Sequence, residues 1–347
     1  MIRNRKIKVA LVGCGRIAAT HFNAIKHHDT DLELVAVCDV DHLRLEKAAS
    51  EQHVPGYSSL EKMLQEELAD VVILATPSGL HSEQTCLVAS YGKHVITEKP
   101  MATQWKDGVR MVEVCDAAGV YLFVIKQNRQ NATIQALKKA IDAGRFGRIY
   151  LVTSNVFWTR PQSYYEQDYW RGTWEFDGGA FMNQASHYVD LLDWLIGPVE
   201  SIQSMMGTLA RNIEVEDTGV LNIKWRSGTL GSMSVTMLTY RQNLEGSITI
   251  LGENGTVRLG GPALNQIEHW EFKDKVELPE EINQLNYQIS SVYGTGHILY
   301  YENVINVFRG KAKPQTDGHE GLRSLELLVS AYMAQHEGKT IHLPVEQ

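Results

Sequence analysis

The sequence predicts an α/β protein with two domains: a first domain on a parallel sheet, and an α+β second domain on a large, mostly antiparallel open sheet. Strand-like and helix-like segments alternate through the first 125 residues, which is typical of βαβ units. Beyond them, β-branched alternating segments are joined by short turns. A chain of 347 residues is also long for one core. We therefore expect domains at residues 1–125 and 126–347, with the C-terminal helix able to pack back on the first.

The first domain is expected to begin with a buried strand and to alternate from there. Its strands are predicted at Ile7–Val12, Leu34–Cys38, Val71–Ala75, His94–Thr97 and Tyr121–Ile125. Its helices are predicted at Ile17–His27, Leu43–Glu51, Leu60–Glu66, His81–Tyr91 and Trp105–Ala118. Right-handed crossovers would bring the carboxyl ends of these strands to one edge of the sheet, where ligands bind.

The second domain is predicted from the change of residue type after Lys126, since no Gly/Ser-rich linker marks a boundary. Its strands are predicted at Ile149–Trp158, Ser201–Leu209, Asp217–Lys224, Thr229–Met237, Ser247–Leu251, Thr256–Leu259 and Ile341–Leu343. Its helices are predicted at Thr133–Ala143, Phe181–Leu195, His297–Phe308 and Gly318–Glu337. Turns such as Arg226-Ser227-Gly228 favour antiparallel pairing of these strands.

The composition is that of an ordinary globular protein, with 44% hydrophobic and 21% charged residues. A net charge of −8 argues against a nucleic acid as the main partner. The basic start of the chain lacks the apolar core of a signal peptide, and no apolar run approaches the ~18 residues of a membrane span. We therefore expect a cytoplasmic protein without membrane contact. The four cysteines form no C-x-x-C pair, which favours reduced, buried thiols and no metal site.

The first chemical signal is Gly-x-Gly-x-x-Ala between a buried strand and a helix, in the segment Val9–Ala18. Gly13 permits the tight turn, Gly15 lets the backbone approach a pyrophosphate, and Ala18 keeps the helix close to the sheet. The N-terminus of the helix would face the anion. A tight turn in a domain that binds no nucleotide is the structural alternative, and the acidic end of the next strand argues against it.

Asp39 ends that next strand, 26 residues after Gly13. A carboxylate at this place accepts both ribose hydroxyls of NAD and repels the 2′-phosphate of NADP. Arg44 lies one helical turn further on, so no cation adjoins Asp39 in the sequence. We therefore predict NAD as the cofactor. The residues predicted to bind it are Gly13, Gly15, Arg16, Ile17, Asp39, Thr76, Pro77, Ser78, His81, Glu98, Lys99, Gln127, Trp170 and Arg171.

The second signal is Glu98-Lys99-Pro100, which follows the strand His94–Thr97 and so places Lys99 at the ligand-binding edge. A residue before proline is held extended. An ammonium at that edge could hydrogen-bond a substrate hydroxyl and stabilise a developing alkoxide. A solvated loop lysine is the alternative, and it is the simpler interpretation of Lys99 taken alone.

The third signal lies in Asp177–Asp190, where Asn183 and His187 share one face of a predicted helix that Gly178-Gly179 opens. A histidine can take a hydroxyl proton while hydride leaves the same carbon. A lone helical histidine more often has a structural role. The catalytic interpretation of His187 therefore depends on Asn183 and on the glycine pair.

The fourth signal is a long loop between Trp158 and Trp174, in which aromatic residues and arginines gather. Long loops in compact domains often bind ligands, and arginine presents a bidentate fork to carboxylate or phosphate. A packing loop is the structural alternative. With the cations of the run 126–129, the loop predicts an anionic substrate. The residues predicted to bind it are Lys99, Lys126, Asn128, Arg129, Arg160, Tyr164, Tyr165, Asn183 and His187.

The Gly-x-Gly-x-x-Ala turn, the Glu-Lys-Pro motif and the Gly-Gly-x-x-x-Asn-x-x-x-His helix, in this order, resemble the Gfo/Idh/MocA oxidoreductases. The resemblance runs over nearly the whole chain and implies a Rossmann domain followed by an α+β domain. It implies Lys99 and His187 as the catalytic pair. Many members carry Asp four residues before the histidine, where this chain has Asn183. Because an amide cannot act as a base, the proton transfer would fall to His187, with Asn183 orienting the substrate.

Within the family, the run 126–129 and the long loop look like those of the 3-dehydrogenases of UDP-N-acetylglucosaminuronate. That likeness implies NAD-dependent oxidation of a sugar C3 hydroxyl, a homotetramer or dimer, and a place in surface-polysaccharide (lipopolysaccharide O-antigen) biosynthesis. One alternative is a dehydrogenase of a free sugar or polyol, of the inositol or glucose type, which would not need Arg160 and Arg171. Another is a non-catalytic NAD-bound sensor, which would not need Lys99 with His187.

Overall fold

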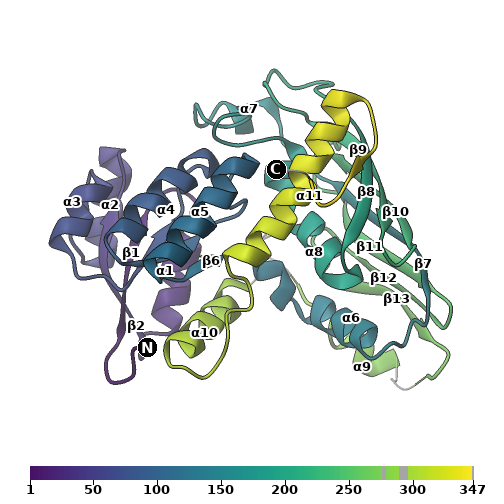
Figure 1. The fold of residues 1–347 in the computed structure, drawn as a ribbon, viewed down its shortest axis with the longest axis horizontal. Helices are drawn as coiled ribbons and strands as arrows, with labels where there is room; N and C mark the ends of the chain where they lie inside the picture. The colour runs from purple at the N-terminus through teal and green to yellow at the C-terminus, as the bar shows by residue number, and fades with distance from the viewer. Residues whose placement is uncertain (276–278, 289–295, 346–347) are drawn as a thin grey trace. The chain divides into compact units, whose positions relative to one another are not determined.

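The computed structural model describes residues 1–275, 279–288 and 296–345 (Figure 1). The chain forms two compact units, one of residues 1–127 with 295–325 and one of residues 128–294 with 326–347. The segment 295–325, which the division by sequence position grouped with the second domain, thus belongs to the first unit. The sequence pattern of this segment predicts helices with an apolar face. It does not indicate which of the two cores that face packs into.

The first unit is built on a six-stranded sheet in the order β3-β2-β1-β4-β5-β6, and the pairs described are all parallel. The strands are β1 (Ile7–Val12), β2 (Leu32–Cys38), β3 (Gly56–Tyr57), β4 (Val71–Leu74), β5 (His94–Thr97) and β6 (Leu122–Val124). This confirms the predicted parallel sheet. The chain turns back between β1 and β4, and that topological switch point is where doubly wound sheets bind their ligands.

The helices of this unit are α1 (Ala18–His27), α2 (His42–Gln52), α3 (Leu60–Glu66), α4 (His81–Ser90), α5 (Trp105–Ala118) and α10 (Gly296–Phe308). Local chemistry sets their starts. Asp41 accepts the Arg44 N–H at 3.0 Å at the start of α2, and Ser59 caps α3 in the same way. Helix α10 packs its Tyr300 and Tyr301 into the same core as β1.

The second unit is built on an eight-stranded sheet in the order β13-β12-β11-β7-β10-β9-β8-β14. The strands are β7 (Ile149–Phe157), β8 (Val199–Gly207), β9 (Thr218–Trp225), β10 (Leu230–Thr236), β11 (Glu245–Gly252), β12 (Gly255–Gly260), β13 (Gln266–Phe272) and β14 (Ile341–His342). Strands β10 and β7 run parallel, whereas the other described neighbours run antiparallel. The predicted mostly antiparallel sheet is therefore confirmed.

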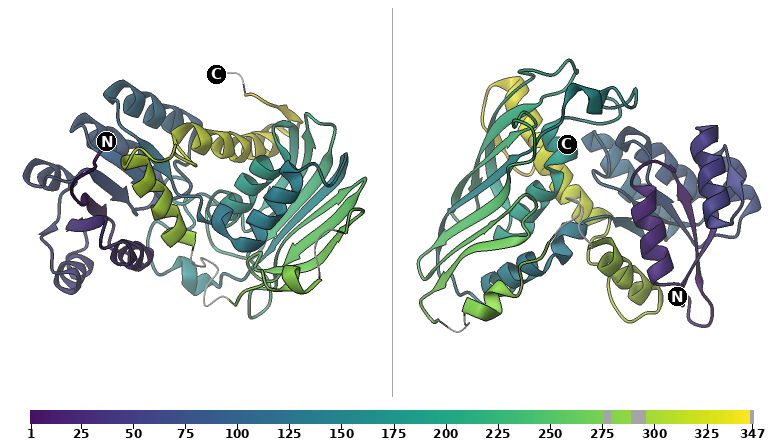
Figure 2. Two further views of the ribbon diagram at one scale, coloured as in Figure 1. Left: turned by 90° about the horizontal axis from the view of Figure 1, so that it is seen from below. Right: turned by 180° about the vertical axis from the view of Figure 1, so that it is seen from behind.

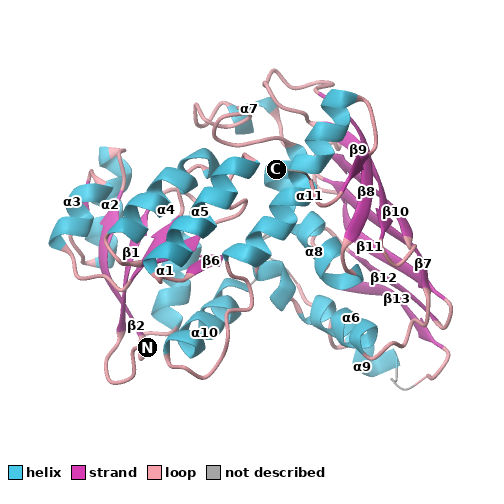
Figure 3. Cartoon of the chain, in the orientation of Figure 1, coloured by secondary structure: helices cyan, strands magenta, loops and turns pink. Residues whose placement is uncertain are grey.

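Helices cover one face of this second sheet (Figures 2 and 3). They include α6 (Ala132–Asp142) and α8 (Ser186–Ile196), with α7 (Gln162–Tyr165) and α9 (Pro279–Asn283) in the connections and the end of α11 (Gly318–Glu337). On β9, Leu221 and Ile223 are buried while Val220 and Lys224 face outward. Among the described residues the outward face carries no helix (Figure 2). None of the described helices combines the length and apolar character needed to cross a membrane.

Candidate active site

The turn after β1 has the backbone that a dinucleotide needs. Gly13 has φ +93°, and a Cβ there would lie 2.6 Å from the Ala75 carbonyl oxygen, so any side chain is excluded. A Cβ at Gly15 would meet a guanidinium nitrogen of Arg44 at 4.0 Å, which leaves room above the backbone. No side chain caps the start of α1 at Ile17. The turn therefore fits a pyrophosphate at the N-terminus of a helix.

Asp39 lies directly beside this turn. One carboxylate oxygen accepts the Cys14 N–H at 2.7 Å and the other accepts the Asp41 N–H at 2.8 Å. The Asp39 carboxylate thus connects the end of β2 to the glycine turn. It lies in the place where a ribose would present its hydroxyls. Arg44 lies near the turn as well, 3.7 Å from Asp41.

The end of β4 supplies the next part of the edge. Thr76 donates its hydroxyl hydrogen to Gln84 Oε1 at 2.6 Å, and Pro77 and Ser78 lead into a short 3₁₀ turn. His81 is fully buried, with its ring nitrogens 3.0 Å from the Thr76 and Pro100 carbonyl oxygens. The His81 ring therefore lies between the end of β4 and the loop that carries Lys99, and a neutral ring donates to one of these two carbonyls. Its predicted contact with NAD stays a prediction.

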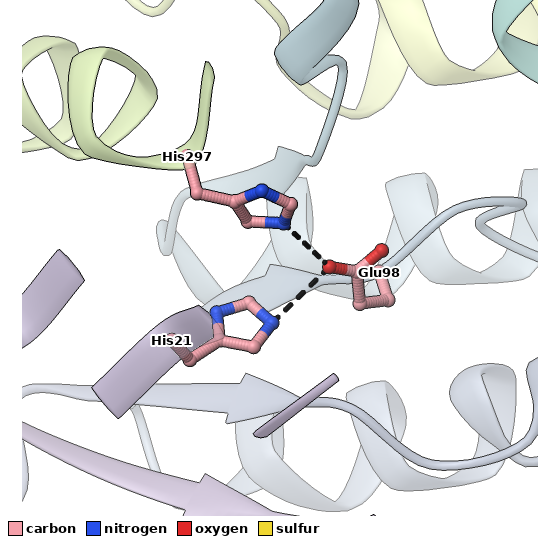
Figure 4. Close-up of side chains that lie close together, drawn as sticks. All are labelled: His21, Glu98 and His297. Atoms are coloured by element: carbon pink, nitrogen blue, oxygen red, sulfur yellow. Dashed lines mark hydrogen bonds and ion pairs between the residues drawn. The ribbon is translucent and has the colours of Figure 1, made fainter. Parts of the chain in front are cut away.

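Lys99 follows β5 at the carboxyl edge of the parallel sheet and is partly exposed, whereas Glu98 beside it is buried. The peptide bond between Lys99 and Pro100 is cis. Burial would raise the pKa of Glu98, but hydrogen bonds from His21 and His297 hold it well below the ordinary range (Figure 4). Neither histidine was predicted as a site residue, because nothing in a single sequence links two such distant positions to Glu98.

The segment that carries Asn183 and His187 is interrupted, which corrects the predicted continuous helix Phe181–Leu195. Residues Ala180–Gln184 form a π-helical turn, Ala185 ends it, and α8 starts at Ser186. The Ala185 N–H donates to the Ala180 carbonyl at 2.8 Å, an i to i+5 bond. Such turns are frequent at functional sites. His187 is buried at the start of α8.

Glu216 and Tyr332 hold the start of this π-helical turn. Glu216 Oε1 accepts the Phe181 N–H at 2.9 Å and the Tyr332 hydroxyl at 2.8 Å. The Tyr332 oxygen in turn accepts the Met182 N–H at 3.1 Å. A Cβ at Gly179 would overlap the Glu216 carboxylate, which explains the second glycine of the motif. Glu216 and Tyr332 were not predicted from the sequence, since both lie far from the motif along the chain.

The long loop brings together three residues predicted to bind substrate, Arg160, Tyr164 and Tyr165, with two predicted to bind the cofactor, Trp170 and Arg171. The Arg160 and Arg171 guanidinium carbons lie 5.4 Å and 4.5 Å from the centre of the Tyr164 ring. Arg160 also donates to Gln184 Oε1 at 2.9 Å, which connects the loop to the turn carrying Asn183. Asp168 accepts from Arg171 Nε at 3.0 Å. Trp170 lies under the same guanidinium, and Tyr165 is buried.

The run 126–129 is less accessible than the sequence suggested. Lys126 is buried and donates to the Ser324 hydroxyl. Arg129 forms a bidentate pair with Asp190 at 2.8 Å for both bonds. Gln127 and Asn128 are buried as well. These contacts give Lys126 and Arg129 structural partners, and their predicted contact with substrate stays a prediction.

Comparison with known families decides the assignment. Residues 7–126 match the NAD-binding Rossmann fold of the Gfo/Idh/MocA oxidoreductase family, and residues 138–343 match its C-terminal alpha/beta domain. The chain belongs to the Gfo/Idh/MocA oxidoreductase family. This confirms the resemblance drawn from the three motifs, the oxidoreductase class and NAD as the cofactor.

Two solved structures are similar over the whole chain. One is the WlbA dehydrogenase from Bordetella pertussis in complex with NADH and UDP-GlcNAcA, 58% identical, with 100% of both chains covered and a TM-score of 0.96. The other is the WlbA dehydrogenase from Chromobacterium violaceum in complex with the same ligands, 59% identical, with 100% of this chain and 98% of that chain covered and a TM-score of 0.96. The D-apiose dehydrogenase of Paraburkholderia graminis is 26% identical over 98% of this chain and 90% of its own.

Proposed function

We propose that the protein is an NAD-dependent dehydrogenase that oxidises the C3 hydroxyl of UDP-N-acetylglucosaminuronate (UDP-GlcNAcA) to the 3-keto sugar. The observation that carries this proposal is the full-length similarity, at 58% and 59% identity, to two WlbA dehydrogenases bound to NADH and UDP-GlcNAcA. The arginines of the long loop support it, because a nucleotide sugar acid carries a diphosphate and a carboxylate, which guanidinium groups bind.

Three of the predicted residues act directly on the reacting hydroxyl and the sugar. His187 accepts the proton of the C3 hydroxyl as that group becomes a carbonyl. The Lys99 ammonium hydrogen-bonds the same oxygen and stabilises its negative charge. Asn183 orients the sugar. NAD⁺, when bound at the Gly13 turn, supplies the hydride acceptor for the C3 hydrogen.

Cation placement favours a charged substrate over a free polyol. Arg160 and Arg171 flank Tyr164 on the loop beside Asn183, where they can meet an anionic group. A neutral sugar such as an inositol needs neither guanidinium. The free-sugar alternative therefore leaves the most distinctive feature of the loop unexplained.

The proposal includes the oligomeric state and the cellular location, and the outward face of the second sheet bears on the first of these. The outward face of the second sheet exposes Met205, Val220 and Leu230, with relative exposures of 70%, 41% and 55%. Burying such a face against a second copy would remove apolar surface from water. We propose a homotetramer, with a dimer as the smaller possibility, that works in the cytoplasm in the synthesis of a diacetamido-uronic acid for lipopolysaccharide O-antigen.

A turnover assay tests the proposed substrate. Enzyme at a concentration comparable to NAD is mixed with UDP-GlcNAcA, UDP-GlcNAc, UDP-glucuronate, myo-inositol or glucose, and NADH is followed by absorbance. We expect NADH with UDP-GlcNAcA, less with the two sugars that lack one substituent, and none with the free sugars. Faster NADH formation from myo-inositol or glucose would replace the proposal with the polyol alternative.

A further inference from the structure

A buried cluster links three distant parts of the first unit at Glu98. His21 Nε2 lies 3.1 Å and His297 Nε2 lies 3.0 Å from the same carboxylate oxygen, Glu98 Oε1 (Figure 4). His21 comes from α1, the helix that follows the glycine turn, and His297 comes from the first turn of α10. The three residues are 0%, 1% and 7% exposed, in the order His21, His297 and Glu98. Burying polar groups to this extent is costly unless they are paired.

The hydrogen bonds assign the protons in the cluster. Tyr301 Oη lies 2.7 Å from His21 Nδ1, so the hydroxyl donates to that nitrogen and His21 donates from Nε2 to Glu98. Burial lowers the pKa of His21, which agrees with a neutral ring. Among the described residues, nothing pairs with the buried His297 Nδ1, so a proton there would be unsatisfied and the ring donates from Nε2. Glu98 is thus an anion held by two N–H donors.

The other carboxylate oxygen of Glu98 connects the cluster to the backbone of Lys99. Glu98 Oε2 accepts the backbone N–H of Lys99 at 3.2 Å. On the far side of the lysine, His81 Nδ1 lies 3.0 Å from the Pro100 carbonyl oxygen. The Lys99 N–H is therefore held by the Glu98 carboxylate, to which His21 and His297 donate, and the buried His81 ring lies against the next carbonyl along the chain.

We propose that His21 and His297, acting through Glu98, are positioning residues that fix the backbone of Lys99 and so aim its ammonium at the reacting hydroxyl. This inference rests on the proposed function, in which Lys99 stabilises the alkoxide. The cluster also joins the cofactor-binding helix to the lysine loop, because α1 carries His21 one turn after Ile17. A shift of about 1 Å in a catalytic group can cost on the order of 100-fold in rate.

The same ligand atoms, all within 4.8 Å of one another, would also suit a metal ion. A 2-His-1-carboxylate set is a known arrangement for divalent iron. In this structure the nitrogen–oxygen distances are those of hydrogen bonds, and Tyr301 completes the pattern. Bound metal is therefore the outcome that would overturn the positioning role.

Substitutions of His297 separate positioning from simple packing. In His297→Gln the amide nitrogen can still donate to Glu98, whereas His297→Leu removes the donor. We expect kcat with UDP-GlcNAcA to fall about 10- to 100-fold in His297→Leu and to recover most of that loss in His297→Gln. The KM for NAD is expected to change less than about twofold in both variants, because the glycine turn and Asp39 are untouched. The matched control is His94→Asn, at the other end of β5, which should keep kcat.

A second variant and a second readout keep the test decisive. If His297→Leu does not fold, Glu98→Gln keeps the side-chain shape but sets an amide nitrogen against the Lys99 N–H, and it should show the same loss of kcat. Reductive methylation of Lys99, quantified by mass spectrometry, needs no substrate. We expect its rate to change in His297→Leu and in Glu98→Gln but not in His94→Asn. If the wild type does not turn over UDP-GlcNAcA, the proposed function fails while the methylation result still tests the inference.

Three results would overturn the inference. One is a His297→Leu variant whose melting temperature falls while its kcat and its rate of Lys99 methylation stay at the wild-type values. Another is a Gln variant no better than the Leu variant while both are folded. The last is stoichiometric divalent metal in the purified protein that is lost in His297→Leu.

Discussion

The side-chain amide of Asn183 donates a hydrogen bond to the carboxylate of Asp177. Asp177 is buried, and its other oxygen accepts the Gly172 N–H at 2.7 Å. The resemblance to the family implies an aspartate at the position of Asn183 in many members, and in this chain a carboxylate from the preceding loop lies against the asparagine instead. Asp177 therefore sets which end of the Asn183 amide faces the protein.

Asp177→Asn is expected to lower kcat about tenfold, because an uncharged partner no longer fixes the Asn183 amide, and a lost hydrogen bond to a charged group is worth about 1.5–3 kcal/mol. Steady-state kinetics with UDP-GlcNAcA measures the change. Asn183→Ala should lose at least as much, and the double variant should lose no more than Asn183→Ala alone. Additive losses would show that the two residues act independently.

Lys99→Ala and His187→Ala are each expected to lose about 10²–10⁴ in kcat, which is the usual contribution of a positioned acid–base or electrostatic group. Binding of NADH, measured by fluorescence, should change little. Lys106→Ala, at the exposed start of α5, serves as the control for loss of a cation. A near-wild-type rate in either variant would remove that residue from the mechanism.

Asp39→Ala is expected to weaken NAD binding about tenfold and to relax the preference for NAD over NADP. The carboxylate that accepts the ribose hydroxyls is lost, and Arg44 already lies near the glycine turn, where it can meet a 2′-phosphate. Titrations with both cofactors measure the selectivity. Asp31→Ala, just before the opposite end of β2, should leave the selectivity unchanged. Unchanged selectivity in Asp39→Ala would refute the role of Asp39.

Local patterns made the first unit predictable. The run of apolar residues in β1, the glycine turn and Asp39 lie within 33 residues of one another (7–39), so backbone sterics and strand order determine their arrangement. The predicted bounds of α5 and α11 coincide with the observed bounds, because a helical period and a flanking Gly119 or Gly338 mark them. Short elements such as α7, in which Tyr164 and Tyr165 are buried, carry too few residues to produce a period.

The missed site residues share a different feature, which is long-range pairing. His21 and Tyr301 are 280 residues apart. Glu216, which accepts the hydrogen bond from the Phe181 N–H, is 35 residues from it. Sequence alone showed that Gly179 is special but could not show that a carboxylate occupies the space of its missing side chain. The π-helical turn has the same origin, since its start is held by Glu216 and Tyr332 rather than by local propensity.

Glu216→Gln is expected to flatten the dependence of stability on pH. Burial raises the pKa of Glu216 to about 7, with Tyr332 as its hydroxyl donor and Asp177 as the neighbouring charge. Between the ordinary pKa near 4.5 and the folded value near 7, the folded state binds more protons than the unfolded state, so stability falls as pH rises. The wild type should lose on the order of 3 kcal/mol across that window from this group.

Denaturant unfolding of the wild type and Glu216→Gln at pH 5, 6, 7 and 8 measures this effect. The variant should be the more stable protein at pH 8 and should differ least from the wild type at pH 5, where Glu216 is protonated in the folded state. Burial lowers the pKa of His94 from the ordinary 6.5 to about 4, so this residue makes stability rise with pH up to about 6.5, but it does so equally in both proteins and cancels in their difference. Parallel stability curves for the two proteins would contradict the raised pKa.

Gly179→Ala is expected to destabilise the second unit by about 1–3 kcal/mol and to lower kcat, because the new methyl group overlaps the Glu216 carboxylate. Gly207→Ala on β8 is the control, since its Cβ would meet a movable Leu209 methyl group at 3.2 Å. Glu216→Ala removes the obstruction, so the double variant Gly179→Ala/Glu216→Ala should be more stable than the sum of the two single losses predicts. Additive losses would show that Gly179 is required for another reason. The double variant restores the space at Gly179 but lacks the hydrogen bond from the Phe181 N–H to Glu216. If its stability recovers while its kcat does not, Glu216 contributes to activity by holding the turn that carries Asn183.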